Sequence, residues 1–143
     1  MNKVYTLSKK IWFMTISFLQ YLFGGADVWI RSLCLLMTID IITGLIKAIH
    51  GTSEKSAKGF IDSTVMWQGG IKKILTLVVV CVATIISYLI TPDTMAIRIV
   101  TISYYVAEEA LSILENITAC GYKPPIYLVR ILEKLIKDID NDE

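Results

Sequence analysis

The chain has 143 residues, enough for one domain, and 55% of them are hydrophobic, with a mean hydropathy of +0.61. Soluble globular domains are less apolar than this, so the composition indicates an integral membrane protein. The 14 basic and 13 acidic residues nearly cancel, which argues against a general nucleic-acid-binding protein.

The N-terminal part, residues 1–27, begins with three lysines (Lys3, Lys9 and Lys10) and continues into an apolar, aromatic stretch at residues 11–23. A helix of that length covers about 20 Å, which is less than the hydrocarbon core of roughly 30 Å. We therefore expect an interfacial, re-entrant or poorly spanning segment. Residues 24–27 then break the helix, and Asp27 is placed to cap the next one.

Residues 28–49 are the first stretch long enough to cross a bilayer, and they open a helical transmembrane domain over 28–121. Asp40, Thr43, Gly44 and Lys47 follow i+3, i+4 and i+7 spacing and therefore share one face. Gly44 permits close approach of another helix. Asp40 lies too centrally to reach the membrane surface, so it is either a structural acid bonded to a neighbouring helix or part of a pore or assembly surface.

A polar loop at about residues 50–70 separates this stretch from residues 74–90, which contain no charged side chain. Their β-branched residues would suit a buried strand in water, but at this length a membrane helix is the better interpretation. Residues 91–94, Thr-Pro-Asp-Thr, predict a tight turn into the next helix.

Residues 97–117 are also long enough to span, yet their polar side chains follow one helical stripe. At about 100° per residue, this stripe contains Arg98, Thr101, Tyr105, Glu108, Glu109, Ser112 and Asn116. A carboxylate in hydrocarbon costs roughly 2.5 to 10 kcal/mol, so Glu108 and Glu109 are expected to face water, a cation or a protonating environment. The stripe and the Asp40 face are therefore candidates for pore lining or assembly. The alternative is an amphipathic helix of a soluble bundle.

The last part, residues 122–143, follows a predicted left-handed helix cap at Gly121 and begins with Pro124 and Pro125. Its apolar stripe faces away from its charged residues, which predicts an amphipathic helix too charged to cross a membrane. It could lie on the membrane surface or pair with copies of itself.

The distribution of lysines predicts the topology. The loop after residue 49 and its flanks are rich in lysine, whereas the turn at 91–94 has no basic residue, so the loop and the C-terminus are expected in the cytoplasm. This gives three spans, or four if residues 11–23 also cross. We expect the helices that carry Asp40 and Glu108 to run antiparallel. Lys47 and Glu115 would then lie at similar depth near the cytoplasmic face, where they could form an ion pair.

Three groups of residues, by their order and spacing from about Val28 to Leu135, resemble the TcdE-like holins of toxin secretion and phage lysis. They are Thr38-Ile39-Asp40 with Thr43-Gly44 and Lys47-Ala48-Ile49, then Ser63-Thr64 with Gly69-Gly70-Ile71-Lys72-Lys73, and Leu114-Glu115-Asn116-Ile117 with Gly121, Pro124-Pro125 and Leu128. Many such holins carry an acid late in the middle span, where this chain has Ser87.

The resemblance implies a homo-oligomer in the bacterial cytoplasmic membrane that opens a non-specific lesion, through which a bacteriophage endolysin or a large toxin leaves the cell. Two other classes stay open: a small ion channel or transporter subunit, and a membrane scaffold or antiholin that opens nothing. An enzyme is not expected, because the sequence contains no nucleophile with a base, no metal cluster and no phosphate loop. No cofactor, metal or nucleic-acid partner is expected.

Overall fold

The computed structural model describes residues 2–51 and 63–140, and these residues form five α-helices without a strand. The helices are α1 (Asn2–Phe23), α2 (Val28–Ile49), α3 (Ser63–Ile90), α4 (Ala96–Ala119) and α5 (Ile126–Asp140). The predicted helix at residues 28–49 coincides with α2. The first and third helices begin earlier than expected, because the basic residues before position 11 and residues 63–73 are helical as well. The all-α fold class is therefore confirmed.

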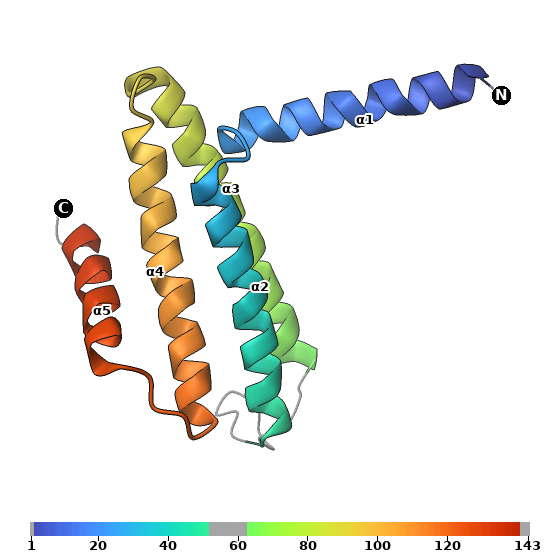
Figure 1. The fold of residues 1–143 in the computed structure, drawn as a ribbon. Helices are drawn as coiled ribbons and strands as arrows, with labels where there is room; N and C mark the ends of the chain where they lie inside the picture. Colours follow the sequence, from blue (N-terminus) through green and yellow to red (C-terminus); the bar gives the residue numbers. More distant parts are fainter. Residues whose placement is uncertain (1, 52–62, 141–143) are drawn as a thin grey trace.

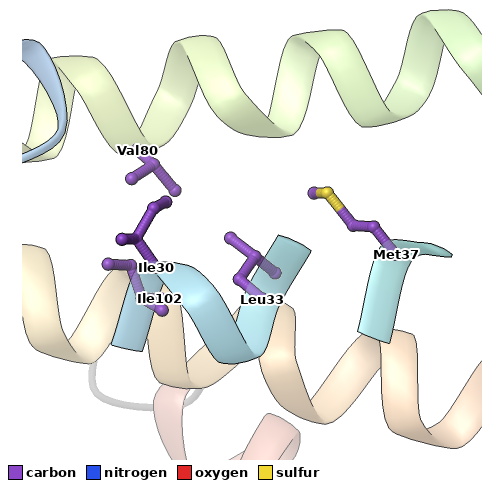
Figure 2. Close-up of a cluster of buried hydrophobic side chains, with 5 residues drawn as sticks. All are labelled: Ile30, Leu33, Met37, Val80 and Ile102. Carbon is purple, nitrogen blue, oxygen red and sulfur yellow. The ribbon is translucent and has the colours of Figure 1, made fainter. Parts of the chain in front are cut away.

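Helices α2, α3 and α4 pack side by side into a three-helix bundle, while α1 projects sideways from one end and α5 folds back along α4 (Figure 1). The bundle core contains Ile30, Leu33 and Met37 of α2, Val80 of α3 and Ile102 of α4 (Figure 2). These five side chains are at most 8% exposed, so they form the apolar contact that holds the three helices together.

The bundle is apolar on its outside as well. Two of the described helices are long and apolar enough to cross a membrane: α2, and Met66–Ile90 within α3. Only 11% of the most apolar window of α2 and 22% of that of α3 are buried, whereas the core helix of a soluble protein would be mostly buried. Exposed side chains such as Leu35, Val82 and Leu89 form the outer surface. This surface fits a membrane protein and argues against a soluble bundle.

One prediction about the bundle is wrong: α2 and α4 run parallel, not antiparallel. In chain order α3 comes between α2 and α4 and runs in the opposite direction to both, so α2 and α4 share a direction (Figure 1). Contacts between them confirm this, because Asp27 meets Arg98 and the later residue Asp40 meets the later residue Asn116.

The predicted helix ends agree with the structure. Asp27 caps α2, since its Oδ1 accepts a hydrogen bond from the backbone N–H of Ile30 at 3.1 Å. Gly121, with φ of +91°, has the left-handed conformation predicted after α4.

Candidate functional site

A cluster of charged and polar side chains lies between the three helices of the bundle. Lys73 of α3 donates to Asp40 Oδ2 of α2 at 2.9 Å and to Glu109 Oε2 of α4 at 2.5 Å. Asn116 of α4 donates through Nδ2 to Asp40 Oδ1 at 3.1 Å and to Thr43 Oγ1 at 3.3 Å. We call these five residues, Thr43 included, the central cluster. Each helix of the bundle contributes to it, so it links all three.

The backbone brings these groups together because α2 and α4 are parallel and close. Gly44 faces α4, and a Cβ atom at this position would lie 3.7 Å from Asn116 Nδ2. Asp40, Thr43 and Gly44 therefore share the face of α2 that meets α4, as their spacing predicted. Asp40 is bonded to both neighbouring helices, and its role in a pore or assembly surface stays a prediction.

The central cluster holds one ammonium and two carboxylates, and all three side chains are largely shielded. The exposed fractions are 15% for Lys73, 17% for Asp40 and 12% for Glu109. In such surroundings an unpaired charge is costly, whereas a lysine between two carboxylates satisfies both. Lys73 is the cation on which both carboxylates depend within the described residues.

A second polar group, which we call the Arg98 clasp, lies at the end of the bundle where α1 joins α2. The Arg98 side chain is 2% exposed and donates to Asp27 Oδ2 at 2.8 Å, to Asp27 Oδ1 at 3.1 Å and to the carbonyl of Phe23 at 2.8 Å. Its backbone N–H donates to Ser87 Oγ of α3 at 2.8 Å. The clasp thus connects α4 with the α1–α2 turn and with α3.

Arg98 affects two residues of the α1–α2 turn, Asp27 and Gly24. The hydrogen bond from the Arg98 guanidinium holds the pKa of Asp27 below its ordinary value, and the backbone N–H of Ile30 adds to this effect, against a rise from partial burial. Gly24 has φ of +71°, and a Cβ atom there would lie 2.6 Å from Arg98 Nε. Glycine is therefore required both by the backbone conformation and by the closeness of Arg98.

The predicted polar stripe of α4 is divided between the inside and the outside of the bundle. Arg98, Glu109 and Asn116 face α2 and α3, whereas Glu108 is exposed and accepts a hydrogen bond from Tyr104 Oη at 3.3 Å. The remaining stripe residues have intermediate burial and are Thr101, Tyr105 and Ser112. Adjacent Glu108 and Glu109 thus have different surroundings.

Lys47 is half-buried on α2 and Glu115 is exposed on α4. The parallel register sets Gly44, the residue one turn before Lys47, against Asn116. The ion pair between Lys47 and Glu115 stays a prediction.

Sequence reasoning missed two partners in these groups. It used Lys73 as a marker of the cytoplasmic flank and as part of a family resemblance, although a lysine ten residues after the first residue of α3 lies well inside a helix that begins at Ser63. It placed Arg98 on the stripe without its acid, although Asp27 and Arg98 each stand at the start of a helix. For two parallel helices that start at the same end of a bundle, opposite charges at their starts indicate a possible ion pair.

A family model and one named relative indicate the same family. A family model described as the bacteriophage holin family matches residues 17–137. A probable holin of Bacillus phage phi105 is 32% identical over 86% of this chain and 83% of its own length. An uncharacterized 14.9 kDa protein of Clostridium perfringens is 32% identical over 80% of this chain and 82% of its own. An uncharacterized protein of Bacillus subtilis, YqxH, is 32% identical over 73% of this chain and 69% of its own length. No solved structure matches.

Proposed function

This chain belongs to the bacteriophage holin family, and we propose that it oligomerises in the bacterial cytoplasmic membrane to open a non-specific lesion through which an endolysin or a large toxin leaves the cell. The family is not an enzyme family, so the protein is not an enzyme. The observation that carries the proposal is the arrangement of the bundle, which has charged groups inside and apolar side chains outside.

We propose that α2, α3 and α4 span the membrane. The 24 residues of α4 cover about 36 Å, which is enough for the hydrocarbon core. Two of its charged residues, Arg98 and Glu109, are paired with α2 and α3 inside the bundle, which lowers the cost of placing them at membrane depth. This internal pairing supports α4 as a third span beside the two apolar helices.

We propose that α1 lies in the membrane interface and does not form a fourth span. It leaves the bundle sideways, so it would lie along the membrane plane when α2 to α4 cross it (Figure 1). Its exposed aromatic residues include Trp12 and Phe13, and the Lys9 ammonium lies 4.5 Å from the centre of the Tyr5 ring. Aromatic and basic side chains of this kind favour the headgroup region.

The proposed topology keeps the loop between α2 and α3 and the end of α4 in the cytoplasm. The α1–α2 turn and the turn at residues 91–94 are then outside. An interfacial α1 lies on the outer side in this topology, so its lysines do not follow the positive-inside rule that residues 28–121 obey. The connection from α4 to the C-terminal helix α5 then lies on the cytoplasmic side.

The lesion requires several copies, because three spanning helices cannot enclose a passage wide enough for a folded protein. In a single subunit the charges of the central cluster satisfy one another, so the subunit can stay in the membrane as a stable unit. We propose that the central cluster and the Arg98 clasp hold each subunit together during assembly. Of the predicted stripe, exposed Glu108 remains available to water, whereas Glu109 and Asn116 hold α2 and α3.

The proposal is tested by induction in a bacterial host, with membrane potential and escape of a folded cytoplasmic enzyme recorded together. A large lesion passes ions and proteins alike, so the potential should collapse when the enzyme escapes. Collapse of the potential without enzyme escape would contradict the proposal and favour a small ion channel. No effect on either quantity would favour a membrane scaffold or an antiholin.

The small channel is retained as a second candidate because Asp40 and Glu109, from two parallel helices, converge on one point. Carboxylates on facing helices are typical ion ligands in channels. Here Lys73 occupies the position between them, which favours the structural role of the central cluster.

A further inference from the structure

The C-terminal helix α5 is amphipathic, with one apolar and one charged face. Its apolar stripe is half-buried, and these residues are Val129, Leu132, Leu135, Ile136 and Ile139. The opposite face exposes Arg130, Glu133, Lys134, Lys137 and Asp138. The predicted amphipathic pattern is therefore present, with the apolar stripe used for packing.

Helix α5 packs along α4 and runs back toward the start of α4 (Figure 1). Ile139 and Asp140, at the end of α5, line a pocket of about 290 Å³ together with Val100, Thr101 and Tyr104, which lie in the first three turns of α4. The end of α5 thus reaches the part of α4 that is remote from the α4–α5 connection. A helix lying flat on the cytoplasmic surface would not reach this pocket, so the position of α5 along α4 differs from the cytoplasmic position expected from the sequence.

The charges of α5 decide what surrounds it in this position. If α4 crosses the membrane, α5 lies beside it at membrane depth, and its exposed face would meet either lipid or water. Each charged side chain in hydrocarbon is costly, and here five lie on the exposed face away from α4. In this position water is a more favourable neighbour for the charged face of α5 than lipid.

We infer that in the assembled lesion α5 lies between α4 and the aqueous lumen, so that the charged face of α5 forms the lumen wall. The inference rests on the proposed function, because a lumen exists only if the lesion forms. This face carries three basic and two acidic residues, so the wall is hydrophilic and close to neutral. Such a wall attracts neither acidic nor basic proteins, which suits a passage that does not select its cargo.

The experiment locks α5 onto α4. The full chain, with Cys34→Ala, Cys81→Ala and Cys120→Ala, carries the pair Val100→Cys and Asp140→Cys, whose positions line the same pocket. A reducible bifunctional thiol reagent bridges the pair in liposomes of phosphatidylethanolamine and phosphatidylglycerol that contain a folded fluorescent protein. The control pair is Val82→Cys with Asp140→Cys, because Val82 is exposed on α3, whereas α5 packs mainly against α4 within the described residues.

We expect bridging of the first pair but not of the control pair, and the same release of the fluorescent protein from bridged and reduced samples. A spin label on Lys134→Cys in the released state should be accessible to a water-soluble nickel chelate rather than to oxygen in lipid. If the reduced sample releases the fluorescent protein but the bridged sample does not, α5 has to leave α4 for the lesion to form. This result would overturn the inference and keep the proposed function. A lipid-exposed label or no bridging would also overturn it. No release from the cysteine-free parent would overturn the proposed function itself.

Discussion

At the scale of single residues, Lys72 and Lys73 are adjacent in sequence but have different surroundings. Lys73 bonds both carboxylates of the central cluster, whereas Lys72 is exposed. Lys73→Met leaves two shielded carboxylates without their cation, and we expect it to lower the free energy of unfolding by about 3 kcal/mol or more. Lys72→Met should stay within about 0.5 kcal/mol of the parent, as surface substitutions do. Thermal unfolding in detergent micelles measures both.

A second variant shows whether the effect of Lys73→Met comes from charge. Adding Glu109→Gln to Lys73→Met removes one of the two unpaired carboxylates and should restore part of the lost stability. Glu108→Gln is the matched control, because Glu108 is exposed and lies outside the central cluster. Equal losses from Lys72→Met and Lys73→Met would contradict the described cluster.

Asp27 has two roles that a pair of substitutions separates. Asp27→Asn keeps an N-cap residue but loses the charge that pairs with Arg98, whereas Asp27→Ala loses both. The Arg98 hydrogen bond lowers the pKa of Asp27 in the folded state. The stability it contributes is therefore present above the ordinary aspartate pKa of about 3.9 and is lost as the pH falls through the lowered folded-state pKa.

We expect the parent to lose more stability than Asp27→Asn when the pH falls from about 6 to about 2.5, since only the parent has this carboxylate to protonate. The difference is small, because the Asp27 side chain is 39% exposed and solvent screens the pair. Asp93→Asn, an exposed position in the turn at residues 91–94, is the control. The same acid sensitivity in the parent and in Asp27→Asn would rule out a contribution of this ion pair.

The sequence placed the α2 and α4 members of the central cluster on polar helix faces, but it predicted neither that these faces meet nor that Lys73 joins them. Helical spacing places Asp40, Thr43 and Gly44 on one face and Glu109 and Asn116 on another, because it depends on the geometry of one helix alone. Lys73 could not be assigned in this way. Its partners lie 33 and 36 residues away, and their meeting depends on how far α3 extends and how the three helices are rotated.

At the scale of helices and turns, Gly24 and Gly25 form a matched pair of sites. Both have positive φ, so alanine strains the backbone at either position by about 1 kcal/mol. A Cβ atom at Gly25 has nothing within 4 Å, whereas one at Gly24 overlaps Arg98, whose guanidinium is fixed by Asp27 and Phe23. Gly24→Ala should therefore cost about 1.5 to 3 kcal/mol more than Gly25→Ala, the worth of hydrogen bonds to a charged group.

Unfolding in micelles measures the difference, and the distance between spin labels on α1 and α4 reports whether α1 changes direction. A change of α1 in Gly24→Ala but not in Gly25→Ala is expected, because the clasp holds the Phe23 carbonyl at the end of α1. Equal behaviour of the two variants would show that backbone strain alone matters at this turn.

The helices were predictable from sequence where a strong local signal marks their ends. Asp27 and Gly121 mark the start of α2 and the end of α4 correctly. The starts of α1 and α3 were misplaced, because polar residues such as Lys9 and Lys72 were taken as the flanks of a span although they continue a helix. The parallel direction of α2 and α4 follows from counting the passes of the chain, and the antiparallel expectation neglected the pass through α3.

At the scale of the whole molecule, the bundle separates two kinds of contact. Its interior combines a small apolar core around Leu33 and Ile102 with two polar groups, the central cluster and the Arg98 clasp. Its exterior is largely apolar on α2 and α3. In a bilayer the apolar exterior gives no drive for helices to associate, so polar contacts and close packing hold the subunit together. The outer surface is then free to meet lipid or other copies.

The last prediction concerns the number of copies that act together. If a lesion forms only when several subunits associate, release from vesicles should rise more steeply than the first power of the protein-to-lipid ratio. Vesicles loaded with both a small dye and a folded protein should release the two above the same threshold ratio, since a wide lesion passes both. Release proportional to the ratio would contradict assembly. Dye release at ratios that retain the protein would instead indicate small selective pores, and it would favour the ion-channel alternative over a holin lesion.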